Sequence, residues 1–173
     1  MEIEATDFDG VLLARSQPAV DDRGSFTRLW CKESLSPNEA AQMNLAVTTH
    51  RGTIRGLHFQ TGDDWEAKFI RCLRGAMVLV AVDLRTDSAT YLQHFQQRLD
   101  PSTSVGVQIP IGFAQGYQTL AADTEVLYVM SRPYKPEAGS GFRYDDPAFS
   151  IRWPLPPVNV SSRDQNWPAY NDV

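Results

Sequence analysis

Three side chains in this chain have the types and spacing to do chemistry: His58, Gln60 and Gln115. His58 and Gln60 stand two residues apart in Arg55-Gly56-Leu57-His58-Phe59-Gln60, and Gln115 follows the Pro110-Ile111-Gly112 turn. Small β-barrel enzymes commonly hold a metal with a His-x-His pair on one strand and a further histidine after such a turn. Glutamine occupies the other two places here, and a carboxamide is a poor replacement for imidazole. The pattern therefore predicts no metal and leaves His58 to act as a base.

The elements that must position these side chains are predicted to be short strands separated by turns. Each is rich in β-branched, aromatic and leucine residues, and Gly, Pro, Asp and Ser stand between them. The predicted strands cover residues 68–73, 76–84, 91–99, 105–109 and 125–131. Such regular short strands favour an all-β barrel or sandwich. Within 91–99, alternation places Tyr91, Phe95 and Leu99 on the buried face and His94 toward solvent.

A helix is predicted in one place only, and an ordered tail in another. Ser36-Pro37-Asn38-Glu39 puts serine at an N-cap, proline at the first helical position and glutamate at the third, a reciprocal capping arrangement. This helix must be short because an extended segment begins at Asn44. The tail is rich in proline but keeps Trp153, Trp167 and Tyr170, so we expect it to wrap the barrel.

Length, charge and cysteine content restrict the class of protein. With 173 residues, of which 42% are hydrophobic, the chain can close one core, and we expect a single domain over 1–173 with 154–173 packed on it. A net charge of -5 and a pI near 5.1 argue against nucleic acid as a partner. Two widely spaced cysteines, Cys31 and Cys72, and no signal-like start favour free thiols in the cytoplasm. No apolar run is long enough to cross a membrane.

Several segments together resemble the dTDP-4-dehydrorhamnose 3,5-epimerase family. In order, they are Asp21-Asp22-Arg23-Gly24-Ser25-Phe26, Gln42-Met43-Asn44, the run from Arg51 to Gln60, the run from Ala67 to Gly75, Val82-Asp83-Leu84-Arg85, Glu125-Val126-Leu127-Tyr128 and Asp145-Asp146-Pro147. The resemblance implies a cupin-type double-stranded β-helix, a jelly-roll barrel with one or two short helices. It also implies a homodimer that uses no metal or cofactor and acts on a nucleoside-diphosphate-linked 4-keto-6-deoxy hexose.

The resemblance further implies the catalytic residues. His58 would be the base, Asp164 the carboxylate that pairs with it, Lys68 the cation that stabilises the enolate, and Tyr128 the acid on the opposite face. Taken alone, each has a plain structural reading: a core histidine, a surface acid, a solvent-facing lysine and a strand tyrosine with its hydroxyl at the rim. Alternation does not settle Lys68, because neither face of its strand is cleanly polar.

Polar, charged and aromatic residues are expected to bind the nucleotide sugar. By the resemblance, arginines hold the diphosphate with help from amide donors, Phe26 packs on the base and Tyr134 lines the sugar site. The full set is Arg23, Phe26, Gln42, Asn44, Arg55, Gln115 and Tyr134. Arg55 lies three residues from His58, so alternation puts the two on opposite faces of the strand. Both can reach one ligand only if Gly56 bends or bulges the backbone.

One departure from the family pattern leaves other functions open. Gln115 stands where many members carry histidine, and glutamine can donate a hydrogen bond but cannot carry a proton or a charge. The first hypothesis is an epimerase that inverts C3, C5 or both in deoxysugar biosynthesis, for a surface polysaccharide or a glycosylated product. The alternatives are a 3,4-ketoisomerase on the same substrate class and a sugar-binding cupin without turnover. A metal-dependent oxygenase is the least favoured.

Overall fold

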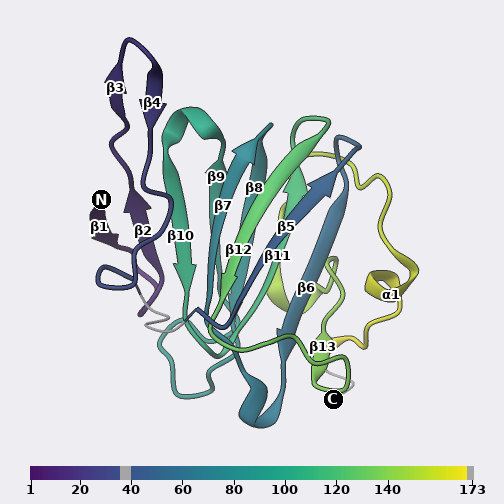
Figure 1. Ribbon diagram of the computed structural model, residues 1–173. Coiled ribbons are helices and arrows are strands. Elements are labelled where there is room, and N and C mark those ends of the chain that lie inside the picture. Colours follow the sequence, from purple (N-terminus) through teal and green to yellow (C-terminus); the bar gives the residue numbers. More distant parts are fainter. Residues whose placement is uncertain (36–39, 171–173) are drawn as a thin grey trace.

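Two facing antiparallel sheets make up most of the molecule. The computed structural model describes residues 1–35 and 40–170 and is almost entirely β (Figure 1). One sheet has the order β1 (Glu2–Ala5), β2 (Leu12–Arg15), β10 (Val105–Ile109), β7 (Lys68–Arg74), β12 (Thr124–Met130) and β5 (Gln42–Thr48). The other has the order β13 (Gly139–Gly141), β6 (Ile54–Gln60), β11 (Phe113–Thr119), β8 (Met77–Asp83) and β9 (His94–Leu99). This is the predicted all-β, cupin-type barrel.

The remaining elements are short and lie outside the two sheets. A hairpin of β3 (Ala19–Asp21) and β4 (Gly24–Phe26) extends past the ends of the strands (Figure 1). Single turns of 3₁₀-helix form at η1 (Gly62–Asp64), η2 (Pro101–Thr103) and η3 (Pro147–Phe149). The helix predicted at 36–39 lies outside the described residues. The structure does describe one α-helix that was not predicted, α1 (Ser162–Gln165). The Ser161 hydroxyl caps this helix by accepting a hydrogen bond from the Asp164 amide.

The predicted strands are confirmed with one correction at the start of β9. β10 has the predicted bounds, β7 differs from the prediction by one residue at one end, and β8 and β12 differ by one residue at each end. Residues 91–93 are not part of the strand: Tyr91 and Leu92 form a turn in which Leu92 adopts a left-handed φ of 61°, and the Gln93 amide donates to the Thr90 carbonyl. His94 is not a free solvent-side residue either: it is half-buried, and its Nδ1 lies 2.9 Å from the Phe149 carbonyl oxygen.

The main core fills one end of the space between the sheets. Apolar side chains from both sheets meet there, with Phe95 and Leu99 of β9 on the buried face, as alternation predicts. From the six-stranded sheet come Ile70, Cys72, Val107 and Val126, and from the five-stranded sheet come Leu79, Ala81, Phe113 and Tyr117. The polar pocket described below opens from the same interior, so the core sets the spacing of the strands that line it.

The outer face of the five-stranded sheet is also covered. Trp153 and Tyr170 pack on a cluster that includes Phe142 and Phe149, together with Val78, Val80 and Val82 of β8. Covered on both faces, β8 is buried at every residue.

Both cysteines are free thiols, and burial raises the pKa of Cys72 to about 11. Within residues 1–35 and 40–170, the structure has no helix long and apolar enough to cross a membrane.

A bulge in β6 determines which of its side chains face the interior. Gly56 has a φ of +133°, and the pairing of β6 with β11 shifts between Gln115 and Tyr117. A Cβ on Gly56 would lie 2.5 Å from the Gly116 Cα, so the two strands approach closely only because both residues are glycine. The bulge resets the alternation of side chains, and Arg55 and His58 therefore face the same cavity.

Candidate active site

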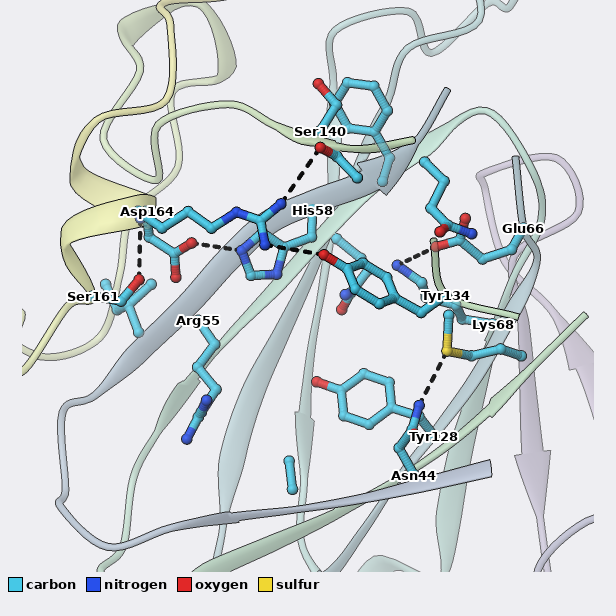
Figure 2. Close-up of a pocket in the computed structure, with 18 of the residues that line it drawn as sticks. Asn44, Arg55, His58, Glu66, Lys68, Tyr128, Tyr134, Ser140, Ser161 and Asp164 are labelled. Atoms are coloured by element: carbon cyan, nitrogen blue, oxygen red, sulfur yellow. Dashed lines mark hydrogen bonds and ion pairs between the residues drawn. The ribbon is translucent and has the colours of Figure 1, made fainter. Parts of the chain in front are cut away.

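A cavity of about 530 Å³ opens between the two sheets, close to α1. Side chains reach it from β5, β6, β7, β11 and β12 and from the segments around Tyr134 and α1 (Figure 2). All four predicted catalytic residues line this cavity, together with four of the predicted binding residues: His58, Lys68, Tyr128, Asp164, Asn44, Arg55, Gln115 and Tyr134. Residues from opposite ends of the sequence therefore converge on one site.

His58 and Asp164 form a close pair at the edge of the cavity (Figure 2). The His58 Nε2 lies 2.6 Å from the Asp164 Oδ1, the imidazole is 36% exposed and the carboxylate is 5% exposed. A carboxylate accepts a hydrogen bond, so Nε2 carries the hydrogen and the lone pair is on Nδ1. The arrangement leaves His58 with one nitrogen available as a base and a carboxylate that stabilises its charged form.

Asp164 is held by the turn that starts α1. Its own amide donates to the Ser161 hydroxyl, and its carboxylate accepts from the Gly56 amide at 3.3 Å and the Trp167 indole at 3.3 Å. Burial alone would raise the pKa of Asp164, but the hydrogen bond and charge of His58 and the Gly56 amide hold that pKa below its ordinary value. The carboxylate therefore stays ionised beside the histidine.

Tyr128 enters the cavity from the facing sheet. It lies on β12, whereas His58 lies on β6, so the two side chains approach the cavity from opposite sheets (Figure 2). Burial, and then repulsion from the neighbouring Tyr117, raise the pKa of Tyr128 well above its ordinary value. At neutral pH the phenol is therefore protonated and able to act as a proton donor. The positive charge of Arg55 opposes the shift and would stabilise the phenolate once it formed.

Lys68 lies in the cavity wall on β7 and is paired with Glu66. The ammonium is 2.8 Å from the Glu66 Oε1, and the two side chains are 8% and 2% exposed. Burial lowers the pKa of Lys68, and the carboxylate of Glu66 opposes that shift. The lysine is therefore an interior charge and not a solvent-facing one, which settles the point that alternation left open.

The two glutamines that replace the expected histidines differ in their surroundings. Gln60 donates to the carbonyls of Asp64 and Pro133 and accepts from the Lys135 amide, so its carboxamide anchors a loop. Gln115 pairs directly with His58 across β6 and β11, and its buried Oε1 has no partner among the described residues. Within that part of the chain, no group of three His, Cys, Asp or Glu side chains is arranged to hold a metal.

Comparison with known proteins assigns the family. Residues 5–172 match the family model for dTDP-4-dehydrorhamnose 3,5-epimerase. The chain belongs to that family. It is therefore an isomerase of the epimerase type. A relative of that name from Sinorhizobium fredii is 36% identical over 164 residues, which are 92% of this chain and 84% of the relative.

Solved epimerases of the family share the fold across nearly the whole chain. A dTDP-4-dehydrorhamnose 3,5-epimerase from Bacillus anthracis, with TDP and PPi bound, has a TM-score of 0.92 and 32% identity over 97% of this chain and 98% of its own. A 3'-monoepimerase from Streptomyces bikiniensis, in complex with dTDP-quinovose, has a TM-score of 0.86 and 29% identity over 95% of this chain and 85% of its own.

Several predicted binding residues of this epimerase form one rim of the cavity. Arg55 donates to the Thr48 hydroxyl at 3.2 Å, which fixes its guanidinium at the edge of β5. Gln42 does not line the cavity itself. It instead donates to the Asn44 side chain at 3.0 Å and accepts from the Tyr134 amide at 2.8 Å. Gln42 therefore positions two lining residues.

Arg23 and Phe26 lie outside the cavity of their own chain. Both belong to the β3–β4 hairpin, where the Arg23 side chain is 90% exposed and Phe26 is 80% exposed. The hairpin follows β2, near the edge of the six-stranded sheet opposite β5 (Figure 1). Arg23 is paired with Asp21 across the hairpin turn. The structure of one epimerase chain therefore separates these two residues from the rest of the predicted set.

Other residues that line the cavity were missed by the sequence analysis. Arg163 stacks over the Trp167 ring at 4.9 Å and donates to the Tyr134 hydroxyl at 3.0 Å, which closes one side of the cavity. No local signal marks these contacts because the tail returns from far along the chain. Glu66 did have a signal: it precedes Lys68 by two residues, the spacing that puts two side chains on one side of an extended segment.

Proposed function

We propose that this epimerase inverts C3, C5 or both in a dTDP-linked 4-keto-6-deoxy hexose through an enolate intermediate. The observation that carries the proposal is that the His58–Asp164 pair and Tyr128 enter one cavity from opposite sheets. Inversion requires removal of a proton from one face of a carbon and its return to the other. The relatives solved with TDP or dTDP-quinovose support the choice of a dTDP-sugar.

The first step is proton abstraction by His58. Its Nδ1 takes the hydrogen from a carbon beside the ketone, and the electron pair of that C–H bond moves to form the enolate with its charge on the ketone oxygen. The imidazolium formed is stabilised by the ionised Asp164. Lys68 donates to the ketone oxygen and stabilises the charge that develops there.

The second step is proton return by Tyr128. The phenol donates its proton to the same carbon from the opposite face, which regenerates the ketone with inverted configuration and leaves a phenolate. Arg55 lies close enough to stabilise that phenolate. Solvent then restores the proton on Tyr128 and removes the one on His58, so the protons balance over a cycle. No metal or cofactor is needed for these steps.

We also propose that the epimerase acts as a homodimer. β5 is the edge strand of its sheet, and its face away from the cavity exposes an apolar stripe of Met43, Leu45 and Val47, which are 61%, 56% and 54% exposed. An open apolar edge is a pairing surface that a second copy can cover. In such a dimer the partner's hairpin can bring Arg23 and Phe26 to the diphosphate and the base. A cytoplasmic location and a role in making polysaccharide precursors stay predictions.

Incubation of the enzyme with dTDP-4-keto-6-deoxyglucose in deuterium oxide tests the proposal. NMR of the product should show deuterium at C3, C5 or both, with inversion at the labelled centre. His58→Ala is the control: it should reduce exchange at every centre by about 10²- to 10⁴-fold and leave dTDP binding largely intact. Transfer of the carbonyl to C3 would instead identify a ketoisomerase, and saturable binding without exchange would identify a sugar-binding protein.

A further inference from the structure

Glu66 and Lys68 form an ion pair that leaves part of its hydrogen-bonding capacity unused in the cavity. Both side chains are nearly fully buried, both line the cavity, and the Nζ–Oε1 distance is 2.8 Å. An ammonium has three donor hydrogens and a carboxylate has two acceptor oxygens. The contact between them uses one of each. The pair therefore presents two unused donor hydrogens on Lys68 beside one unused acceptor oxygen on Glu66.

The protein itself does not satisfy the second oxygen of Glu66. Its Oε2 is buried, and no donor reaches it from residues 1–35 or 40–170. A buried, unpaired carboxylate oxygen is costly, and such groups in a cavity wall indicate a ligand that supplies the missing donor. Glu66 is therefore placed to accept a hydrogen bond from something that enters the cavity.

The strands around Lys68 supply no competing charge. Its neighbours across the sheet are Ile109 on β10 and Met130 on β12, and the Met130 sulfur already accepts from the Asn44 side chain. Of the other ionisable groups that line the cavity, Tyr128 lies on β12, next to β7 in the same sheet, and is neutral when protonated, whereas His58 and Arg55 lie on β6 of the facing sheet. Lys68 and Glu66 therefore act as one unit, which offers a ligand hydrogen-bond donors from Lys68 and one acceptor from Glu66.

The complement of this unit is an acceptor and a donor on adjacent carbon atoms. A ketone beside a hydroxyl has that pattern, because the carbonyl oxygen accepts and the hydroxyl donates. In a 4-keto-6-deoxy hexose, C5 carries the methyl group and the ring oxygen, so the only hydroxyl beside the ketone is at C3. Building on the proposed function, we propose that Glu66 accepts the C3 hydroxyl while Lys68 donates to the C4 ketone.

This contact makes Glu66 a specificity residue as well as a positioning residue. Through Oε1 it holds the Lys68 ammonium in place, an effect that is the same for every 4-keto substrate. Through Oε2 it selects sugars with a free 3-hydroxyl, because a 3-deoxy or 3-O-alkylated sugar leaves that oxygen buried and unpaired. The two effects are separable because only the second depends on the substituent at C3.

Measuring native enzyme and a Glu66 variant, each on two substrates that differ at C3, separates these two effects. The substrates are a dTDP-4-keto-6-deoxy hexose and its 3-deoxy counterpart, and the rate measured is deuterium exchange at the carbon that the native enzyme exchanges in both. Loss of a hydrogen bond to a charged group costs about 10- to 100-fold. We expect the ratio of kcat/KM for the 3-hydroxy over the 3-deoxy sugar to fall by that factor in Glu66→Gln. Glu125→Gln, a carboxylate of β12 paired with Arg74, is the matched control and should keep the native ratio.

Two other results for Glu66→Gln overturn the proposal. If Glu66→Gln slows both substrates equally, Glu66 acts only through Lys68; if it slows neither, the hydroxyl contact does not exist. If thermal unfolding shows that Glu66→Gln is not folded, competition binding of the two sugars to the native enzyme replaces the variant. Equal affinity for the two sugars then refutes the contact between Glu66 and the C3 hydroxyl. Native enzyme that discriminates in binding but exchanges no 4-keto sugar would refute the proposed function and keep the recognition by Glu66.

Discussion

The His58 imidazole and the Tyr128 phenol have surroundings that suit the different roles proposed for them. The ionised Asp164 fixes the hydrogen of His58 on Nε2 and leaves Nδ1 as the base, whereas burial keeps the proton on Tyr128. Either residue in the opposite state would be useless for its proposed role. The two environments differ because His58 sits at the edge of the cavity beside a carboxylate, and Tyr128 sits among apolar and phenolic groups.

Replacement of Tyr128 should separate the two proton transfers. In Tyr128→Phe, His58 still removes the proton, so label should enter from deuterium oxide, but net inversion should slow by about 10²- to 10⁴-fold because the acid is gone. Proton NMR measures label entry, and the product's coupling constants measure inversion. Inversion at the native rate would show that the acid lies elsewhere in the cavity.

The alkaline limit of the reaction should belong to Lys68. Burial lowers the pKa of Lys68 from its ordinary 10.5 despite Glu66, whereas the pKa of Tyr128 is raised. As pH rises, Lys68 therefore loses its proton before Tyr128 does, and the enolate loses its stabilising charge. We expect the rate of label entry to fall at a pH below 10.5, with the same profile in native enzyme and Tyr128→Phe. A profile that changes in the variant would assign the limit to Tyr128.

Among the elements, β6 carries the most unusual backbone. Its bulge at Gly56 puts Arg55 and His58 into the same cavity, and the Gly56 amide also donates to Asp164. One glycine therefore affects the residue proposed to bind the diphosphate, the proposed base and the carboxylate that pairs with it. The close approach to Gly116 on β11 is the packing constraint that keeps any larger residue out.

Alanine at two glycines should distinguish the effect of packing from that of backbone conformation. Gly56 and Gly24 have similar φ values of +133° and +127°, but an added Cβ meets Gly116 at 2.5 Å in the first and nothing within 4 Å in the second. Gly24→Ala should lower the free energy of unfolding by about 1–2 kcal/mol. Gly56→Ala should cost a further ~1–3 kcal/mol. Urea denaturation measures both, and equal losses would contradict the close-packing argument.

For the whole molecule, the main feature is the separation of the hairpin from the cavity. Arg23 and Phe26 are exposed on β3–β4, whereas the cavity lies nearer the β5 edge of the same sheet. A single chain does not join them, but a dimer through the apolar stripe of β5 can. The homodimer and the two hairpin residues are therefore one prediction, because each explains the other.

Mixing two inactive variants should test whether the hairpin serves the partner's cavity. Arg23→Ala and His58→Ala homodimers should each be impaired. In a mixed dimer whose hairpins cross, one cavity carries both changes and the other carries neither, so random mixing restores about a quarter of the cavities. We expect exchange activity to recover on mixing after subunit exchange. No recovery, with mixed dimers confirmed by mass spectrometry, would mean that Arg23 serves its own chain or has no role.

Local pattern in the sequence was enough to predict the strands and the chemistry of several side chains. Alternation and turn residues correctly identified β7, β8, β10 and β12, because strand formation depends on neighbouring residues and on burial of one or both faces. It failed at 91–93, where a left-handed Leu92 ends the extended pattern. Asp164 was predicted only from the family resemblance, because no local sequence pattern marks it as a partner of His58.

The tertiary structure alone shows how these residues meet. The pairing of Gly56 with the 115–117 region puts Arg55 and His58 on one side, and the returning tail brings Asp164 and Arg163 to the cavity. It also leaves Glu66 with a buried, unpaired oxygen and keeps Arg23 away from its own site. These relations join residues far apart in the chain and depend on how strands and tail pack, which short-range sequence patterns do not specify.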